Sequence, residues 1–217
     1  MSILLLTSLF ITFDYLLKNI FGKYYLVHSI CNFFIVLLSI SDVIKLYMNP
    51  YSAMVLSLSS YSSIIVYSLH FYHIIWYYNK LRLDDWLHHI LMIFVALPIA
   101  TYFGSVRLLG HSLFYTTGLP GMIDYFILFL VKNNYVNRLT QKRINLYLNC
   151  YLRNPGCTIH SFITLINIKN ISNLFDILLN IITAILVYWN GVYFMEQVVG
   201  NYHLESKKLP IKNHEKH

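Results

Sequence analysis

The sequence predicts an all-α, polytopic membrane protein, a transmembrane helical bundle of about six or seven spans. Of its 217 residues 57% are hydrophobic and only 12% are charged, and the mean hydropathy is +0.56. A soluble domain of this length has too few charges to cover so much apolar surface. The length suits about six or seven helices of roughly 20 residues with short connections. Two histidine pairs inside the apolar stretches are the third indication, because ionisable groups within a bilayer mark cavities and reaction paths.

Seven apolar segments are the candidate spans. They cover residues 3–17, 24–48, 52–78, 87–103, 106–131, 144–168 and 174–199. The first is short and contains Asp14, so it is either a short span or an interfacial helix. Gly118 and Pro120 predict a kink or break near the centre of the fifth segment, and Pro155 predicts an interruption of the sixth.

The chain is expected to form one membrane domain at residues 24–200, because no linker or low-complexity stretch divides it. Residues 1–23 are the N-terminal short span or interfacial helix, and residues 201–217 are a basic cytosolic tail. The N-terminus lacks a basic start and an A-x-A cleavage site, so removal of a signal peptide is not expected.

The net charge of +7 falls in the connections and the tail rather than along a helix face, so no nucleic-acid partner is predicted. One side of the bilayer has only Lys45, Arg107 and Lys169. The other side receives Lys18, Lys23, Lys80, Arg82, Lys132, Arg138, Lys142, Arg143, Lys207, Lys208, Lys212 and Lys216. The positive-inside rule therefore places the C-terminus and the loop between the histidine pairs in the cytosol.

The two histidine pairs are predicted to face each other at one depth in the membrane. His70 and His73, in SLHFYH, lie near the end of one segment, and His88 and His89, in DDWLHH, lie near the start of the next. A short loop joins these segments, so their helices run antiparallel.

A polar stripe extends the helix face of the first pair, because residues three or four apart share a face. Its members are Ser59, Ser63, Tyr67, His70, His73 and Tyr77. A span that faces only lipid has no use for such a stripe, so it predicts a lined cavity. Hydrogen bonding between helices is the alternative.

His88 and His89 are the groups best suited to catalysis, because an imidazole titrates near pH 6.5 and can act as acid, base or acyl acceptor. Asp84 and Asp85 precede them and either orient a histidine or cap the helix; the sequence favours neither role. Arg153 lies within a span and needs a partner, either an acid or a lipid phosphate. The expected cavity-lining or substrate-binding residues are Tyr67, His70, His73, Asp85 and Arg153.

Four histidines also raise the question of a metal. The arrangement H-x-x-H followed by HH is similar to part of the histidine boxes of membrane di-iron oxygenases, which need further boxes. His28, His111 and His160 are the other histidines within the segments, and none belongs to a further box. No metal site and no cofactor are therefore predicted.

Several motifs follow one another between about residues 24 and 200. They are NFFIVLLSISD, SLHFYH, DDWLHHILM, TTGLPGMIDYFILFLVK, RINLYLNCYLRNPG and YWNGVYFMEQVVG. In their order and spacing the chain resembles the TLC family, which comprises the TRAM, longevity-assurance and related proteins and includes the ceramide synthases.

This resemblance implies a bundle of about six core helices around a lipid-accessible cavity, in the endoplasmic reticulum or a related membrane. In ceramide synthases a histidine pair is needed to transfer an acyl chain from coenzyme A to a sphingoid amine, and His88 and His89 match that pair. The implied partners are membrane lipids and acyl-CoA.

Two functions stay open at this point. The first is a lipid-modifying enzyme, including an acyltransferase, which the paired histidines favour. The second is a non-catalytic protein that binds lipid or cargo. The ceramide synthases carry an acidic H-D-x-x-D stretch where this chain has Tyr115, Thr116 and Thr117, and this difference favours the second function. No inverted repeat or charged pore ring supports a channel or transporter.

The basic asymmetry predicts the topology of the chain. A tag fused to the C-terminus should be digested by protease when only the plasma membrane is permeabilised, because that end is expected in the cytosol. A tag that is digested only after the internal membranes are dissolved would reverse this orientation and move the histidine loop to the lumenal side.

Overall fold

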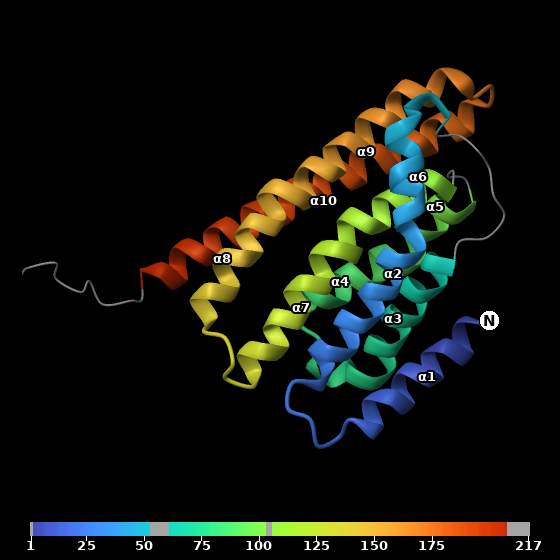
Figure 1. The fold of residues 1–217 in the computed structure, drawn as a ribbon. Coiled ribbons are helices and arrows are strands. Elements are labelled where there is room, and N and C mark those ends of the chain that lie inside the picture. Colours follow the sequence, from blue (N-terminus) through green and yellow to red (C-terminus); the bar gives the residue numbers. More distant parts are fainter. Residues whose placement is uncertain (1, 53–60, 103–105, 208–217) are drawn as a thin grey trace, which may run out of the picture.

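The structure, a computed structural model, describes residues 2–52, 61–102 and 106–207. These residues are mostly helical and contain no β-strand, which confirms the all-α prediction. The α-helices, in chain order in Figure 1, are α1 (Ile3–Leu16), α2 (Lys23–Met48), α3 (Tyr61–Tyr77), α4 (Leu83–Leu91), α5 (Leu97–Tyr102), α6 (Val106–Leu113), α7 (Leu119–Lys132), α8 (Arg138–Leu148), α9 (Asn154–Asn167) and α10 (Leu174–Ser206).

Three helices of the described chain are long and apolar enough to cross a membrane. They are Lys23–Met48, Leu108–Lys132 and Leu174–Ser206, and the shorter apolar helices are Ile3–Leu16 and Asp85–Thr101. The described residues thus have the helices of a membrane protein, while the larger number of six or seven spans stays a prediction. The last of these helices continues past the predicted domain boundary at residue 200.

Three π-helical turns lie within the helical segments. They are η3 (Met92–Ala96) between α4 and α5, η4 (Phe114–Gly118) between α6 and α7, and η5 (Asn149–Arg153) between α8 and α9. The sequence predicts an irregularity in two of these segments, the fifth and the sixth, and none in the fourth. At the irregularities predicted near Pro120 and Pro155 the chain forms the π-helical turns η4 and η5, and the helices continue without a break. Each proline is the second residue of the α-helix that follows its π-helical turn, so the residue without an N–H lies beside the widened turn.

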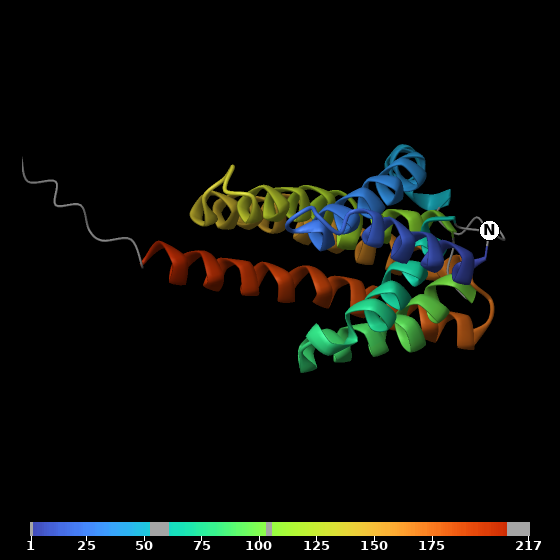
Figure 2. The ribbon, with the colours of Figure 1, turned by 90° about the horizontal axis from the view of Figure 1, so that it is seen from below.

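The helices pack around α2, which contacts α1, α3, α6 and α7. Along the other side of the molecule α9 and α10 run side by side, and α8 continues the line of α9 (Figure 1). Seen from below, α10 and the pair α3 and α4 lie on one side, with α2, α7 and α8 on the other (Figure 2).

The buried core is continuous across α1, α2, α3, α5 and α6. Its fully buried members include Ile35, Tyr72 and Leu97. A smaller cluster joins α2, η4 and α9 through Tyr115 and its neighbours. There Gly156 is required, because the ring of Tyr115 occupies the place where any larger residue would carry its Cβ. Such close contacts between helices are typical of membrane bundles.

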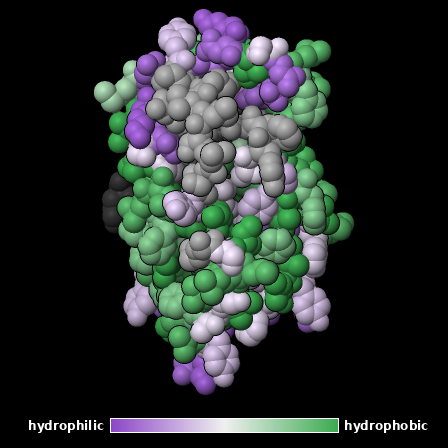
Figure 3. All heavy atoms as spheres, turned by 90° about the vertical axis from the view of Figure 1, so that its right-hand side faces the viewer, coloured by the Kyte–Doolittle hydropathy of each residue, from purple (hydrophilic) through white to green (hydrophobic). Residues whose placement is uncertain are grey.

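The outer surface is strongly apolar. Met48, Leu83, Phe94, Leu174 and Ile185 are each exposed over more than half of their surface. On the face in Figure 3, apolar side chains cover the middle and hydrophilic ones gather toward the two ends. Soluble monomers rarely expose contiguous apolar patches above a few hundred Å², so this surface suits contact with lipid.

Asp14 joins α1 to the bundle, although in the sequence it is the feature that weakens the first span. Its carboxylate is fully buried and forms an ion pair with Lys23 at 2.6 Å. It also accepts hydrogen bonds from Tyr72 Oη (2.7 Å), Tyr77 Oη (2.6 Å) and Trp76 Nε1 (2.9 Å). Because these donors all lie on α3, α1 is part of the packed body.

Replacing Asp14 should loosen α1. Asp14→Ala leaves the hydroxyls of Tyr72 and Tyr77 without their acceptor, and each buried donor left unpaired costs about 1–3 kcal/mol. We expect a loss of about 3 kcal/mol in the free energy of unfolding in detergent, followed by Trp76 fluorescence. Ser8→Ala, on the exposed side of the same helix, is the control. An Asp14→Ala variant as stable as this control would show that the carboxylate does not hold α1.

Candidate functional site

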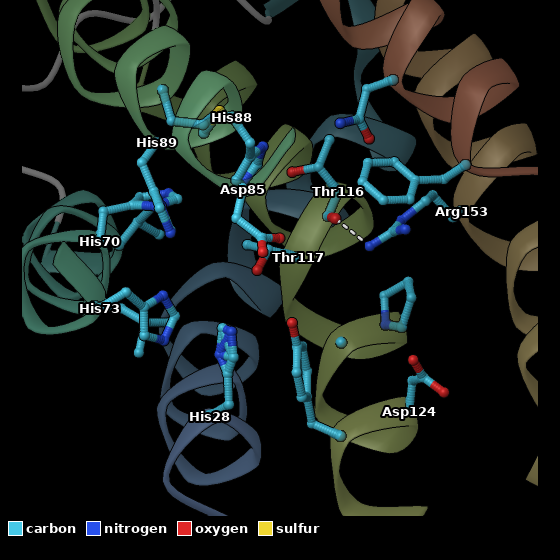
Figure 4. Close-up of a pocket in the computed structure, with 18 of the residues that line it drawn as sticks. His28, His70, His73, Asp85, His88, His89, Thr116, Thr117, Asp124 and Arg153 are labelled. Atoms are coloured by element: carbon cyan, nitrogen blue, oxygen red, sulfur yellow. Dashed lines mark hydrogen bonds between the residues drawn. The ribbon is translucent and has the colours of Figure 1, made fainter. Parts of the chain in front are cut away.

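A cavity of about 940 Å³ lies between the two sides of the bundle, within the size range of small-molecule sites. Figure 4 shows its two walls. On one wall are His28, His70, His73, His88 and His89, and on the opposite wall are Arg153 and Asp124. The cavity is therefore lined by ionisable groups inside an apolar molecule.

One end of the cavity is basic and the other is apolar. Lys80 and Lys132, in the connections after α3 and at the end of α7, are among its lining residues. The connection after α7 lies against the connection between α1 and α2, since Asn133 Nδ2 donates to the carbonyl oxygen of Phe21 at 2.9 Å. Away from this mouth the lining includes Leu97, Leu109, Leu113, Leu186 and Val187, together with the polar Ser112, Thr183 and Asn190.

The two histidine pairs converge, as predicted. His70 Nδ1 and His89 Nδ1 lie 2.7 Å apart and share a hydrogen bond between α3 and α4. The rings of His73 and His89 are 5.3 Å apart, centroid to centroid, and those of His70 and His88 are 5.2 Å apart. His70, His73 and His89 are buried, whereas His88 is exposed because it faces the open cavity.

His28 is a cavity residue that sequence reasoning left unassigned. Its ring lies 4.6 Å from that of His73 and 3.8 Å from that of Tyr125, centroid to centroid. A signal was present in the sequence. His28, His73 and His88 lie five, seven and six residues from Lys23, Lys80 and Arg82, basic residues that are predicted on the same side of the membrane. Residues at the same distance from the same side of the membrane lie at the same depth.

Asp85 lines the cavity, but its carboxylate is used at the start of α4. It accepts the backbone N–H of Arg82 at 3.0 Å and the Nε of Arg82 at 3.5 Å. Between described residues, no hydrogen bond joins Asp85 to a histidine. Of the two roles open in the sequence, capping is the one that this residue performs; the side chain of Asp84 lies outside the described part.

Tyr67 does not line the cavity, contrary to the prediction. The lining face of α3 runs through Val66, His70, His73 and Tyr77, whose directions around the helix axis agree closely. Tyr67 points about 100° away from Val66 and packs beside the buried core. Ser59, also assigned to the stripe, lies outside the described residues.

Arg153 has polar partners but no carboxylate among the described residues. Its Nη2 donates to the carbonyl oxygen of Thr116 at 2.6 Å, and its Nη1 donates to Asn149 Oδ1 at 3.0 Å. The guanidinium lies over the ring of Phe194, 4.5 Å from its centroid, and Nε is buried with no partner. Its positive charge is therefore not neutralised by an ion pair and is presented to the cavity.

A row of amides connects Arg153 to Asp124, and sequence reasoning did not find it. Asn149 Nδ2 donates to Asn145 Oδ1 at 2.6 Å, and Asn145 Nδ2 donates to Asp124 Oδ2 at 3.2 Å. Gln141 Nε2 donates to the other carboxylate oxygen at 2.6 Å. The spacing of four residues from Gln141 to Arg153 was the available signal.

All three π-helical turns of the described chain contribute to the cavity wall. Met92 and Ala96 come from η3, Thr116 and Thr117 from η4, and Arg153 from η5. Such turns are rare and are frequent at functional sites. The carbonyl of Thr116 in η4 receives the guanidinium of η5, so two of these irregular turns fix each other.

The fold and the site define an all-α protein with membrane-length apolar helices and an internal cavity lined by histidines. No family model, no curated protein and no solved structure matches the chain.

The amide row predicts energetic coupling between Asn149 and Arg153. A hydrogen bond to a charged group contributes about 1.5–3 kcal/mol, so a double-mutant cycle of Asn149→Ala and Arg153→Met should give a coupling in that range. The measurement is the free energy of unfolding in detergent. The matched cycle pairs Asn149→Ala with Arg143→Met, an exposed arginine on the same helix, and should be additive within about 0.5 kcal/mol. Additivity in both cycles would show that Asn149 does not hold the guanidinium.

Proposed function

We propose that the protein is a multi-pass membrane protein of the TLC type that acts in lipid metabolism, with an amphipathic lipid bound in the histidine-lined cavity. The observation that carries the proposal is the division of the cavity into a basic mouth, a zone of ionisable groups and an apolar depth. A lipid has the same three parts in the same order, since its charged head, its linkage and its acyl chain follow one another.

Arg153 is suited to bind an anionic lipid headgroup or the phosphates of acyl-CoA. The planar guanidinium suits phosphate and carboxylate oxygens, and its buried Nε has no partner within the protein. Lys80 and Lys132 at the mouth add long-range attraction for such a ligand. An anionic donor that enters from the basic side would reach Arg153 with its acyl chain directed into the apolar depth.

The reaction that this arrangement supports best is acyl transfer from a thioester to a lipid amine or hydroxyl. His88 faces the cavity and accepts the proton of the attacking group. The new bond to the acyl carbon forms, the carbon–sulfur bond breaks, and coenzyme A leaves as the thiol with that proton. His89 is fixed by His70 and positions the pair. We place the protein in the endoplasmic reticulum or a related membrane, with the basic mouth and the C-terminus on the cytosolic side.

Non-catalytic lipid binding is the second candidate, and the η4 turn favours it. Thr116 and Thr117 line the cavity where the ceramide synthases carry acids, and the hydroxyl of Thr117 donates to Asn32 Oδ1 at 3.1 Å. The hydroxyl of Tyr115 lies 2.8 Å from that of Tyr47, outside the set of cavity-lining residues. At these positions η4 offers no carboxylate.

The histidine pair separates the two candidates. General-base catalysis contributes about 10²–10⁴ in rate, so His88→Ala with His89→Ala should abolish turnover. The lipid profile of cells expressing this double variant should then match that of cells lacking the protein. His203→Ala, at an exposed residue that does not line the cavity, is the control at equal expression. A double variant that keeps the full effect on the lipid profile would exclude catalysis by the pair and leave the binding function.

Lipid binding itself is tested by filling the cavity. Ala96→Trp places an indole in the cavity wall, whereas Phe94→Trp changes a side chain on the outside of the same turn. Native mass spectrometry of the purified protein should show a retained lipid in the wild type and in Phe94→Trp, and its loss in Ala96→Trp. Equal retention in all three proteins would contradict a lipid site in the cavity.

A further inference from the structure

Three of the cavity histidines are arranged as a set of metal ligands. One ring nitrogen from each of His70, His73 and His89 lies within 4.8 Å of the others. The exposed fractions of these residues are 7%, 2% and 5%, so each is more than nine-tenths buried. His70 and His73 are three residues apart on α3, and His89 reaches them from α4. Two helices thus hold the three nitrogens from different directions.

We propose that His70, His73 and His89 bind a divalent transition-metal ion, with zinc the best match. This inference goes beyond the proposed function, since a metal can be held whether or not the cavity takes a lipid. The sequence predicted no metal because it offered no further histidine box. Three ligands suffice, however, for a site that keeps one position open.

The spacing of the nitrogens fits tetrahedral coordination. Zinc–nitrogen bonds of about 2.0–2.1 Å at a tetrahedral angle place two ligand atoms about 3.4 Å apart. The separation of 2.7 Å between His70 Nδ1 and His89 Nδ1 is shorter than this, and the limit of 4.8 Å for the whole set is longer. Small side-chain rotations therefore bring all three nitrogens to coordination distance.

A buried histidine nitrogen without a hydrogen-bond partner also supports a metal at this site. A neutral imidazole carries one donor and one acceptor nitrogen, and a buried polar atom without a partner costs about 1–3 kcal/mol. His73 Nε2 is buried with no hydrogen-bond partner. A bound cation would give this nitrogen the partner that the described residues around it do not supply.

The ligand set also selects the metal. Magnesium and calcium prefer oxygen ligands, whereas imidazole nitrogens suit zinc and other first-row transition metals. The common non-haem iron site needs two histidines and a carboxylate, but the nearby carboxylate of Asp85 is used at the start of α4. Three histidines with an open fourth position are characteristic of catalytic zinc.

The cavity gives the metal ion access to the three histidines, and it leaves His88 free of the ligand set. His70, His73 and His89 all line the cavity, so its mouth is an access path for the ion, and the fourth coordination position is directed toward a cavity ligand. His88 is outside the ligand set and faces the cavity beside it, with its ring 5.6 Å from that of His89, centroid to centroid. His88 therefore stays available as the proton acceptor next to the metal.

The test measures metal content and metal affinity directly. The full chain, purified in detergent with a tag that contains no histidine, should hold about one zinc per molecule by plasma mass spectrometry. His70→Ala, His73→Ala and His89→Ala should each fall to the background of the triple variant, whereas His203→Ala should keep its zinc. Zinc no higher in the wild type than in the triple variant would overturn the proposal.

A second measurement guards against variants that fail to fold. Cobalt(II) added to chelator-treated, monodisperse wild-type protein should give the visible absorption of a tetrahedral nitrogen site. His73→Gln should weaken cobalt affinity by at least about tenfold, the smaller effect found even for outer-shell partners. Unchanged affinity in this folded variant would refute the site. Because both readouts are of metal, they are independent of whether the cavity binds lipid or catalyses acyl transfer.

Discussion

The rest of the structure depends on how an apolar bundle satisfies buried ionisable groups. An unpaired charge or imidazole in such surroundings is costly, so each must find a partner from another helix. Asp14 forms an ion pair with one ammonium group and accepts hydrogen bonds from two tyrosine hydroxyls and one indole N–H, and this fixes α1 against α3. His70 and His89 share a hydrogen bond, which fixes α3 against α4. Arg153 takes the carbonyl oxygen of Thr116, which fixes η5 against η4. The polar groups therefore position the helices around the cavity, while the apolar side chains fill the remaining core.

The cavity and the irregular helices have a common physical origin. A π-helical turn inserts an additional residue and redirects the side chains that follow it, and these turns occur in the described chain only where helices border the cavity. At η4 and η5 a proline follows the wider turn, and its missing N–H interrupts the regular pattern of backbone hydrogen bonds there. The result is a wall that presents Thr116, Thr117 and Arg153 to one space. A regular helix would direct some of these side chains toward lipid or a neighbouring helix.

Much of the fold follows from sequence, because it depends on local patterns. Apolar length predicted the helices, and antiparallel connection predicted that His70 and His73 would meet His88 and His89. The features that the sequence did not predict depend mostly on contacts between residues far apart in the chain. The ring donors to Asp14 lie on α3, 58 to 63 residues away, and no local pattern links them. Tyr67 failed because a spacing of three residues drifts around the helix, so the face centred on His70 leaves it aside. The π-helical turns replaced the expected breaks because sequence marks a proline but not how the preceding turn adapts.

The central claim is that one cavity holds an amphipathic ligand between a histidine wall and Arg153. An experimental structure of the full chain in a lipid nanodisc tests it most directly. We expect density for a lipid whose head lies between His88 and Arg153 and whose chain follows Leu113 and Leu186 into the apolar depth. A structure in which His70 and His89 face separate helix interfaces, with Arg153 directed away from any shared space, would contradict it.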